Sequence, residues 1–248
     1  IVDGGRVVAI EGAEGTDGML ARGAQQPGQR RGILVKRPKP GQEMRIDLPA
    51  IGPATISRAA EAGLAGIAVL AGGALVAERV EFVRRADEIG LFVQGFEDAS
   101  IDEQENAGPP PNWQIQTVGS LAPRSRQRAD VFKGASVLSA LAPLAPSLGT
   151  VITRSHVLSV EAGEGVEMLL QRARDLRQWG RRHSARRAGV AVVAQDVALG
   201  PAISGAAASC LAGLAIVGER SSSAERAAKD ANRLGLFVVM LRALPGPA

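Results

Sequence analysis

Cysteine, tyrosine and long apolar runs are scarce or absent in this sequence of 248 residues. The single cysteine, Cys210, excludes an internal disulfide, fits a reducing compartment, and is expected to be a small core residue because it lies in an Ala-rich run. Tyrosine is missing and aromatic residues make up 3%, so Ala, Val, Leu and Ile must form the cores. The longest apolar run, residues 62–77, is interrupted by four glycines and is shorter than the roughly 20 residues that span a bilayer.

Positive and negative side chains are nearly equal in number. Lys and Arg number 29 against 25 Asp and Glu, a net charge of +4, which does not by itself indicate a nucleic-acid partner. A basic cluster does occur at residues 172–187 (RARDLRQWGRRHSARR). It is typical of a solvated helix end and loop, and anionic lipid headgroups are the best functional alternative. We therefore expect no nucleic-acid partner and a peripheral contact with a membrane surface.

The sequence contains an internal repeat. Residues 7–22 (VVAIEGAEGTDGMLAR) align with residues 157–172 (VLSVEAGEGVEMLLQR) at an offset of 150. Residues 64–69 (LAGIAV) align with residues 211–216 (LAGLAI) at an offset of 147. Offsets that change so little along the chain predict two copies of one fold.

Strand-like and helix-like segments alternate in the first copy. Gly4 and Gly5 predict a hairpin turn, and Thr16 is a candidate helix N-cap. Strands are predicted at residues 1–2, 6–11, 32–36, 66–70 and 91–93, and helices at residues 54–62 and along the apolar stripe Val80, Val83, Ala86 and Ile89. The pattern predicts an α/β fold with two tandem copies of a small domain, each a mixed sheet flanked by helices.

Composition also suggests where the copies are divided. We expect the first copy at residues 1–97, a Pro-rich linker at residues 98–122 and the second copy at residues 123–248. A helix predicted at residues 129–141 has no equivalent ahead of Ile1, so the first copy is expected to lack its entry helix. The duplication leaves open whether the halves pair with each other or exchange between chains as a homo-oligomer.

A charged, proline-rich loop stands out at residues 36–53 (KRPKPGQEMRIDLPAIGP). If residues 44–48 are extended, Arg45 and Asp47 point to the same side, because side chains alternate along a strand. Prolines on either side hold Lys39 on a stiff backbone. Cations placed beside carboxylates suit a phosphate ester or anhydride with a hard divalent metal.

Three carboxylates and a hydroxyl gather at residues 11–17 (EGAEGTD), where a strand is predicted to lead into a helix. The glycines permit close backbone approach, and free N–H groups at the helix start can hold a phosphate. An acidic helix start with a capping Thr is also an ordinary structural feature. The residues alone leave both interpretations open.

The second copy keeps the acidic turn and loses the charged loop. Fifteen residues lie between Lys36 and Gly52, whereas six lie between the corresponding Val193 and Gly200. The cations and the aspartate of the loop therefore have no clear counterparts. A loop needed only for folding would be retained in both copies, so its loss favours a function for the loop in the first.

These motifs carry a family resemblance. The segments EGAEGTDGML, LVKRPKPGQEMRIDLPAIGPATI and AGLAGIAV resemble the C-terminal domain of the LpxI-type UDP-2,3-diacylglucosamine pyrophosphatases of lipid A biosynthesis. The resemblance covers about residues 1–96, and residues 125–241 resemble the same domain without the Lys-Pro and Arg-Asp motifs. Family members carry another domain ahead of this one, so we expect either that such a domain, which the activity could need, has been removed ahead of Ile1, or that this protein has changed its use.

The resemblance implies an activity and its site. The implied reaction is metal-dependent hydrolysis of the phosphoanhydride of UDP-2,3-diacylglucosamine to UMP and 2,3-diacylglucosamine 1-phosphate, at the cytoplasmic face of the inner membrane. Asp47 matches the aspartate that the family is expected to need as a metal ligand or base. The other expected residues are Glu14 and Asp17, with Asp47, for Mg²⁺ or Mn²⁺, and Gly15, Thr16, Lys36, Lys39, Gln42 and Arg45 for the substrate. The alternative is a noncatalytic module that binds a lipid-sugar or a nucleotide, with a regulatory or dimerising second copy.

Overall fold

The computed structural model describes residues 1–23, 30–38, 48–97, 112–142, 149–179 and 187–244. The chain divides into two compact units. The first unit comprises Ile1–Ala9 and Gly15–Gly108, and the second comprises Ile10–Glu14 and Pro109–Ala248. Each unit has its own sheet and its own core.

The first unit is built on a five-stranded sheet in the order β2-β1-β3-β5-β7. Strands β3, β5 and β7 run parallel to one another, and β1 pairs antiparallel with both β2 and β3. Helices connect the parallel strands, and a short pair, β4 with β6, lies outside this sheet. The elements are β1 (Val2–Asp3), β2 (Arg6–Val7), α1 (Gly15–Arg22), β3 (Ile33–Lys36), β4 (Ala50–Ile51), α2 (Pro53–Glu61), β5 (Gly66–Leu70), β6 (Leu75–Val76), α3 (Arg79–Ile89) and β7 (Phe92–Phe96).

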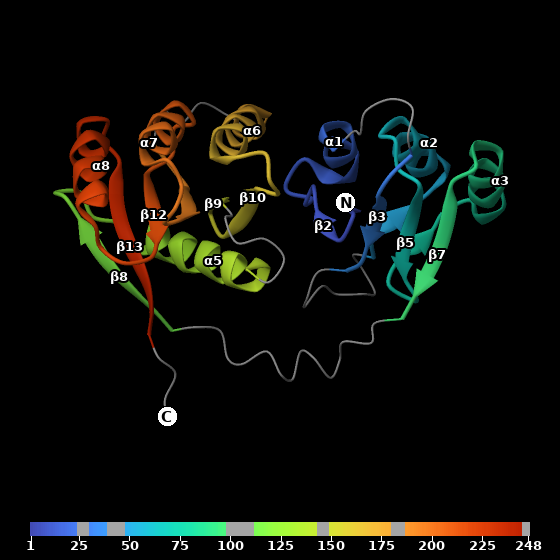
Figure 1. Ribbon diagram of the computed structural model, residues 1–248, viewed down its shortest axis with the longest axis horizontal. Helices are drawn as coiled ribbons and strands as arrows, with labels where there is room; N and C mark the ends of the chain where they lie inside the picture. The colour runs from blue at the N-terminus through green and yellow to red at the C-terminus, as the bar shows by residue number, and fades with distance from the viewer. Residues whose placement is uncertain (24–29, 39–47, 98–111, 143–148, 180–186, 245–248) are drawn as a thin grey trace. The chain divides into compact units, whose positions relative to one another are not determined.

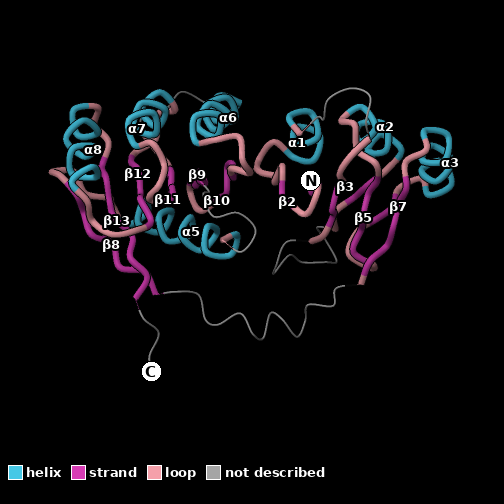
Figure 2. Tube along the Cα trace, in the orientation of Figure 1, coloured by secondary structure: helices cyan, strands magenta, loops and turns pink. Residues whose placement is uncertain are grey.

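One face of this sheet carries the core of the first unit. Helices α1, α2 and α3 all lie on the same side of the sheet (Figures 1 and 2). Their buried faces supply Leu20, Ile56 and Phe82, which pack with Leu34 of β3 and Ile67 of β5. The first unit is therefore a two-layer structure of helices on a sheet within the described residues.

The second unit repeats this plan and adds to it. Its sheet has the order β10-β9-β11-β12-β13-β8, so β10 to β13 reproduce the order of the first unit and β8 extends the edge antiparallel to β13. Helix α5 covers the sheet face opposite to α6, α7 and α8 (Figure 1). The elements are β8 (Asn112–Val118), α5 (Ser125–Leu141), β9 (Gly149–Thr153), β10 (His156–Val160), α6 (Val166–Trp179), β11 (Val190–Ala194), α7 (Leu199–Ala208), β12 (Gly213–Val217), α8 (Ser222–Arg233) and β13 (Phe237–Leu244).

The shared strand order confirms two copies of one α/β fold with mixed sheets. The register supplies a residue-level equivalence, because Lys36 pairs with Val69 at the position where Val193 pairs with Ile216. A further detail is duplicated as well. Phe92 lies over Gly66 and Phe237 lies over Gly213, so closely that a Cβ added to either glycine would meet the ring at 2.4–2.5 Å.

The hairpin and the strand–helix alternation of the first unit agree with the prediction. Two details predicted for its helices were wrong. Helix α1 begins at Gly15, so Thr16 lies within the first turn and is not the N-cap. In α3 the residues that face the core are Phe82 and Ala86, whereas Val80 is 85% exposed. Apolar residues at i, i+3 spacing predict a helix, but they do not determine which side of the helix faces the core.

Two further expectations also need correction. Residues 112–118, predicted as part of the linker, form β8, because Trp113 and Ile115 alternate with exposed glutamines while packing on the core. Cys210 is partly buried rather than a full core residue, and it adopts a left-handed conformation after α7. Over the residues described, no helix combines the length and apolar character needed to cross a membrane.

Candidate functional site

The candidate site of the first unit lies where β3 ends and α1 begins. Lys36 is the last residue of β3, and Gly15 and Thr16 open α1. Gly15 has a φ of 73°, a left-handed conformation that glycine adopts without strain, and no atom lies within 4 Å of where its Cβ would be. Ligands of open α/β sheets commonly bind outside the carboxyl ends of parallel strands, which is where Lys36 lies.

The structure brings Thr16 and Lys36 together. The Lys36 ammonium donates a hydrogen bond to the Thr16 hydroxyl, although 20 positions separate the two residues in sequence. Both side chains are partly buried, so the ammonium is held at the first turn of α1. A cation, a hydroxyl and the N–H groups of a helix start are the groups that bind a phosphate oxygen.

Asp17, the next residue of α1, is engaged in an ion pair. Its carboxylate contacts the Arg58 guanidinium of α2, and the two side chains are 57% and 47% exposed. An ion pair of this exposure contributes about 0–1 kcal/mol, so its main effect is to orient the groups. Sequence reasoning missed Arg58, because nothing in the pattern of α2 distinguishes this arginine from a solvated one.

Five expected site residues are not placed beside Lys36 and Thr16 by the described structure of the first unit. Lys39, Gln42, Arg45 and Asp47 fall within residues 39–47, which are outside the described residues. Glu14 belongs to the segment Ile10–Glu14, which is grouped with the second unit. Their expected roles in catalysis, substrate binding and metal binding therefore stay predictions.

The described residues do not form a complete metal site. Among them, no group of three or more His, Cys, Asp or Glu side chains is placed to hold a metal ion. Asp17, an expected ligand, is paired with Arg58, and that positive charge competes with a cation for the carboxylate. We therefore derive no reaction step through a metal from this geometry.

The equivalent turn of the second unit is held together by its own residues. Glu161 is 6% exposed, and its Oε1 accepts a hydrogen bond of 3.2 Å from the Gly165 N–H. Glu164 accepts one of 2.8 Å from the Ala162 N–H and forms an ion pair with Arg172. The acidic turn therefore has a structural role in this copy.

The pKa values of the two carboxylates of this turn are shifted in opposite directions. Burial raises the pKa of Glu161, and the nearby charge of Glu164 raises it further. Burial would also raise the pKa of Glu164, but hydrogen bonds from the Ala162 N–H and from Arg172 outweigh that effect and lower it. Within the described residues, the buried Oε2 of Glu161 has no hydrogen-bond partner.

The cationic part of the site is replaced by apolar residues in the second unit. Val193 occupies the strand position of Lys36, and Val166 aligns with Thr16 at the repeat offset of 150. No contact like that between Lys36 and Thr16 can form between two valines. The second copy therefore lacks the ammonium and the hydroxyl that meet at this position in the first copy.

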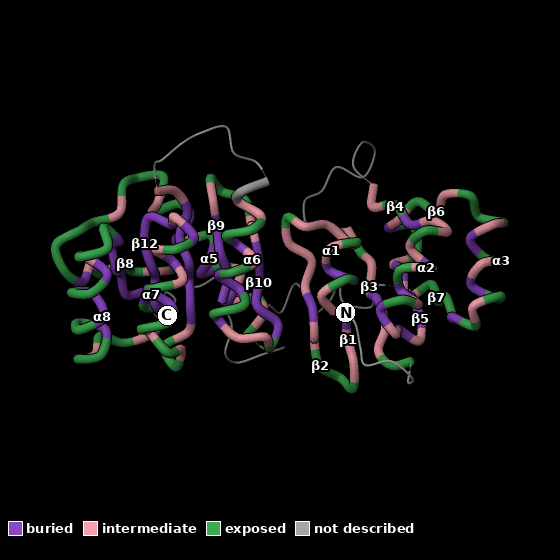
Figure 3. The backbone as a smooth tube through the Cα atoms, turned by 90° about the horizontal axis from the view of Figure 1, so that it is seen from above, coloured by how far each residue is buried: buried purple, intermediate pink, exposed green. Residues whose placement is uncertain are grey.

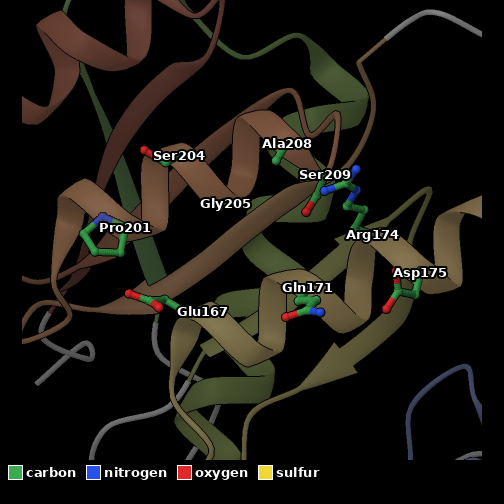
Figure 4. A pocket seen from close by; sticks show the side chains of 9 residues that line it. All are labelled: Glu167, Gln171, Arg174, Asp175, Pro201, Ser204, Gly205, Ala208 and Ser209. Carbon is green, nitrogen blue, oxygen red and sulfur yellow. The ribbon is translucent and has the colours of Figure 1, made fainter.

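A groove of about 790 Å³ runs between α6 and α7 in the second unit (Figure 4). It includes Glu167, which aligns with Asp17, and Gly205, which aligns with Arg58 at the repeat offset of 147. The first unit has an ion pair at these positions, whereas the second has a glycine in place of the arginine. The groove lining is Glu167, Gln171, Arg174, Asp175, Pro201, Ser204, Gly205, Ala208 and Ser209.

Comparison of the sequence with known proteins identifies the same duplication as the structure. The family model of the LpxI C-terminal domain matches residues 1–94 and again residues 115–239. A protein of Caulobacter vibrioides named UDP-2,3-diacylglucosamine pyrophosphatase LpxI is 50% identical over 112 residues, which are 42% of this chain. The match spans 38% of that protein's length. The chain belongs to the LpxI C-terminal domain family, and it carries that domain twice.

Proposed function

We propose that this chain acts in the hydrolysis of UDP-2,3-diacylglucosamine, through its first unit. The observation that carries the proposal is the contact between Lys36 and Thr16, because it holds a cation and a hydroxyl at the start of α1. The copy with this contact is also the copy that keeps the charged loop at residues 36–53. The name of the Caulobacter relative supports the same substrate.

The proposed reaction breaks a phosphoanhydride bond. The oxygen of a water molecule bonds to the α-phosphorus, the anhydride P–O bond breaks, and the products are UMP and 2,3-diacylglucosamine 1-phosphate. Lys36 offsets phosphate charge, and the Thr16 hydroxyl and the first N–H groups of α1 donate hydrogen bonds to the phosphate oxygens. Fixed donors of this kind favour the transition state because its charge gathers on those oxygens.

Metal binding and membrane contact are parts of the proposal that need their own tests. Asp47 is the proposed base or ligand of Mg²⁺ or Mn²⁺, and the remaining expected residues of the loop are proposed to bind the substrate anions. A diacylated substrate resides in a bilayer, so the chain is proposed to work at the membrane surface. Titration of the reaction with each metal, and sedimentation with vesicles of anionic lipid, address these two points.

The central experiment measures UMP release by the purified chain. We expect turnover of UDP-2,3-diacylglucosamine with Mg²⁺ or Mn²⁺, its loss in Asp47→Ala, and a loss of about 10²-fold or more in Lys36→Ala. Lys229→Ala, an exposed lysine of α8, is the matched control and should keep full activity. Equal activity in Lys36→Ala and Lys229→Ala would overturn the assigned role of Lys36.

A noncatalytic binding module is the second candidate. It is favoured by the contact between Lys36 and Thr16 at the start of α1, because these groups can hold a phosphate without any reaction. It predicts saturable binding of the substrate, weakened by Lys36→Ala, with no UMP release under any divalent metal. Turnover that survives purification and depends on Lys36 would exclude it.

A further inference from the structure

A cavity of about 460 Å³ lies at one edge of the sheet of the second unit. Its lining includes Ala212 and Gly235, which come shortly before β12 and β13, and Arg124, which comes directly before α5. Strands β11, β12 and β13 run parallel, so the cavity lies at their amino ends. Val193, which corresponds to Lys36, lies near the carboxyl end of β11, so the cavity is at the other edge of the sheet.

Arg187 brings a guanidinium to this cavity from the segment before β11. Its Nη1 donates hydrogen bonds to the carbonyl oxygens of Leu211 (3.1 Å) and Ala207 (3.4 Å), which hold the partly buried side chain at the end of α7. Among the described residues, its Nε and Nη2 make no hydrogen bond. A guanidinium is a planar fork of N–H donors, so the remaining donors are available to an oxyanion.

The start of α5 supplies further donors. The Gln127 Oε1 accepts a hydrogen bond of 2.6 Å from the Arg124 N–H, which leaves the side-chain NH₂ of Gln127 free to donate to a ligand. The Arg124 side chain is exposed and has no hydrogen-bond partner within the described parts of the chain. The first N–H groups of a helix have no partner within the helix, and they carry partial positive charge. Hydrogen-bond donors from two separate segments therefore border the cavity.

Positive charge at this cavity is not balanced by carboxylates. None of the described residues that line it is acidic, and the first turn of α5 contains no acidic residue. Arg126 and Arg128 add exposed cations at the same end of the helix. Because the helix dipole repels cations at its N-terminus, this arrangement costs stability, and a bound anion would offset that cost.

We propose that this cavity binds a phosphate monoester. Arg187 and Arg124 offset its charge, and the Gln127 amide and the first N–H groups of α5 donate hydrogen bonds to its oxygens. The volume of about 460 Å³ lies within the range typical of small-molecule sites, so it has room for the group that the phosphate esterifies. Arg187, the last residue of the basic cluster at residues 172–187, thereby has a specific role. The proposal does not depend on hydrolase activity.

Titration of the full chain with glycerol 3-phosphate, followed by amide chemical shifts, tests the site. We expect saturable shifts at residues 125–127 and at Arg187, measured against a chloride titration of equal ionic strength. Arg124→Gln changes an exposed side chain, so it should keep the fold and weaken binding at least about fivefold. Arg226→Gln is the matched control on α8, which lies on the other face of the sheet and exposes most of its surface outside a stripe of buried alanines (Figure 3). It should leave the affinity unchanged.

Phosphatidic acid presents the same phosphate monoester in a bilayer, so it distinguishes a lipid headgroup from a soluble ligand. Sedimentation with phosphatidylcholine vesicles, with and without phosphatidic acid, measures this binding. A headgroup site predicts that phosphatidic acid recruits the chain and that Arg124→Gln, but not Arg226→Gln, weakens recruitment at least about fivefold. A site for a soluble ester predicts that only the binding of glycerol 3-phosphate depends on Arg124. The proposal is overturned if neither probe binds, or if the two variants have equal effects on both probes.

Discussion

The Lys36 ammonium and the Thr16 hydroxyl are hydrogen-bonded, which joins the end of β3 to the first turn of α1. In the second unit the corresponding residues, Val193 and Val166, are both apolar. The contact is thus a property of the first copy and not of the fold. It distinguishes a copy with a positioned cation and hydroxyl from a copy that retains only the scaffold at this position.

Thr16→Val should weaken the site without unfolding it. The valine keeps the shape of the side chain and removes the hydroxyl, so the hydrogen bond from Lys36 and any bond to a phosphate oxygen are lost. We expect a fall of about fivefold in kcat/KM or in substrate affinity, which corresponds to a typical net hydrogen bond of about 1 kcal/mol. Thr16→Ser keeps the hydroxyl and should retain most of the activity, and a serine variant as impaired as the valine variant would contradict the role.

Glu161→Gln should stabilise the second unit at neutral pH. Because the folded pKa of Glu161 is raised by burial, its ionisation costs stability as pH rises from the unfolded value of 4.5 through the folded pKa. Below pH 4.5 the carboxyl is protonated in both states and the cost is absent. The glutamine should therefore raise the free energy of unfolding by on the order of 1 kcal/mol at pH 7 and by much less near pH 4.

Hydrogen exchange of the core strands β11, β12 and β13 measures this effect separately from the first unit. Glu167→Gln, at an exposed position of α6, is a matched control and should leave the exchange rates of these strands unchanged at pH 7. A stabilisation by Glu161→Gln that grows toward acid would show that the sign assigned to its pKa is wrong.

Arg172→Ala should destabilise the second unit more at pH 7 than at low pH, because the ion pair with Glu164 depends on pH whereas the hydrogen bond from Arg172 to the Val160 carbonyl does not. The substitution leaves Glu164, with 22% of its side chain exposed, without its ion-pair partner, at a cost of about 1–3 kcal/mol. Since the folded pKa of Glu164 is lowered, its stabilising effect is present above the unfolded value and is lost as pH falls through the folded pKa. Denaturation at pH 7 and at pH 3 measures the change, and the exposed Arg174→Ala is the control.

Phe237→Ala and Phe92→Ala form a matched pair that tests the cover over each sheet. Phe237 is buried beneath the helix layer of α5, so its truncation should cost about 3–5 kcal/mol. Phe92 occupies the equivalent position but is half exposed, so we expect a cost well below that of Phe237→Ala. Exchange rates in β12 and in β5 report the two effects, and equal costs would mean that the first face is covered in solution.

Much of the fold could be predicted from the sequence because local patterns determine it. The strand at residues 66–70 and the helix from Pro53 appear as expected, since a run bounded by glycines and a proline in a first helical turn carry their own signals. The linker was overestimated because the three prolines at positions 109–111 concealed the alternation of β8. The core side of α3 could not be predicted, since it depends on the sheet against which the helix packs.

The sequence by itself determined the duplication, the alternation of strands and helices, and the loss of the charged loop from the second copy. These are properties of residue order and spacing. The tertiary structure alone decided that Lys36 contacts Thr16, that Arg58 pairs with the carboxylate of Asp17, and that α5 covers the second face of the sheet in its own unit. Such contacts join residues far apart in the chain, so they depend on how elements pack and not on any local pattern.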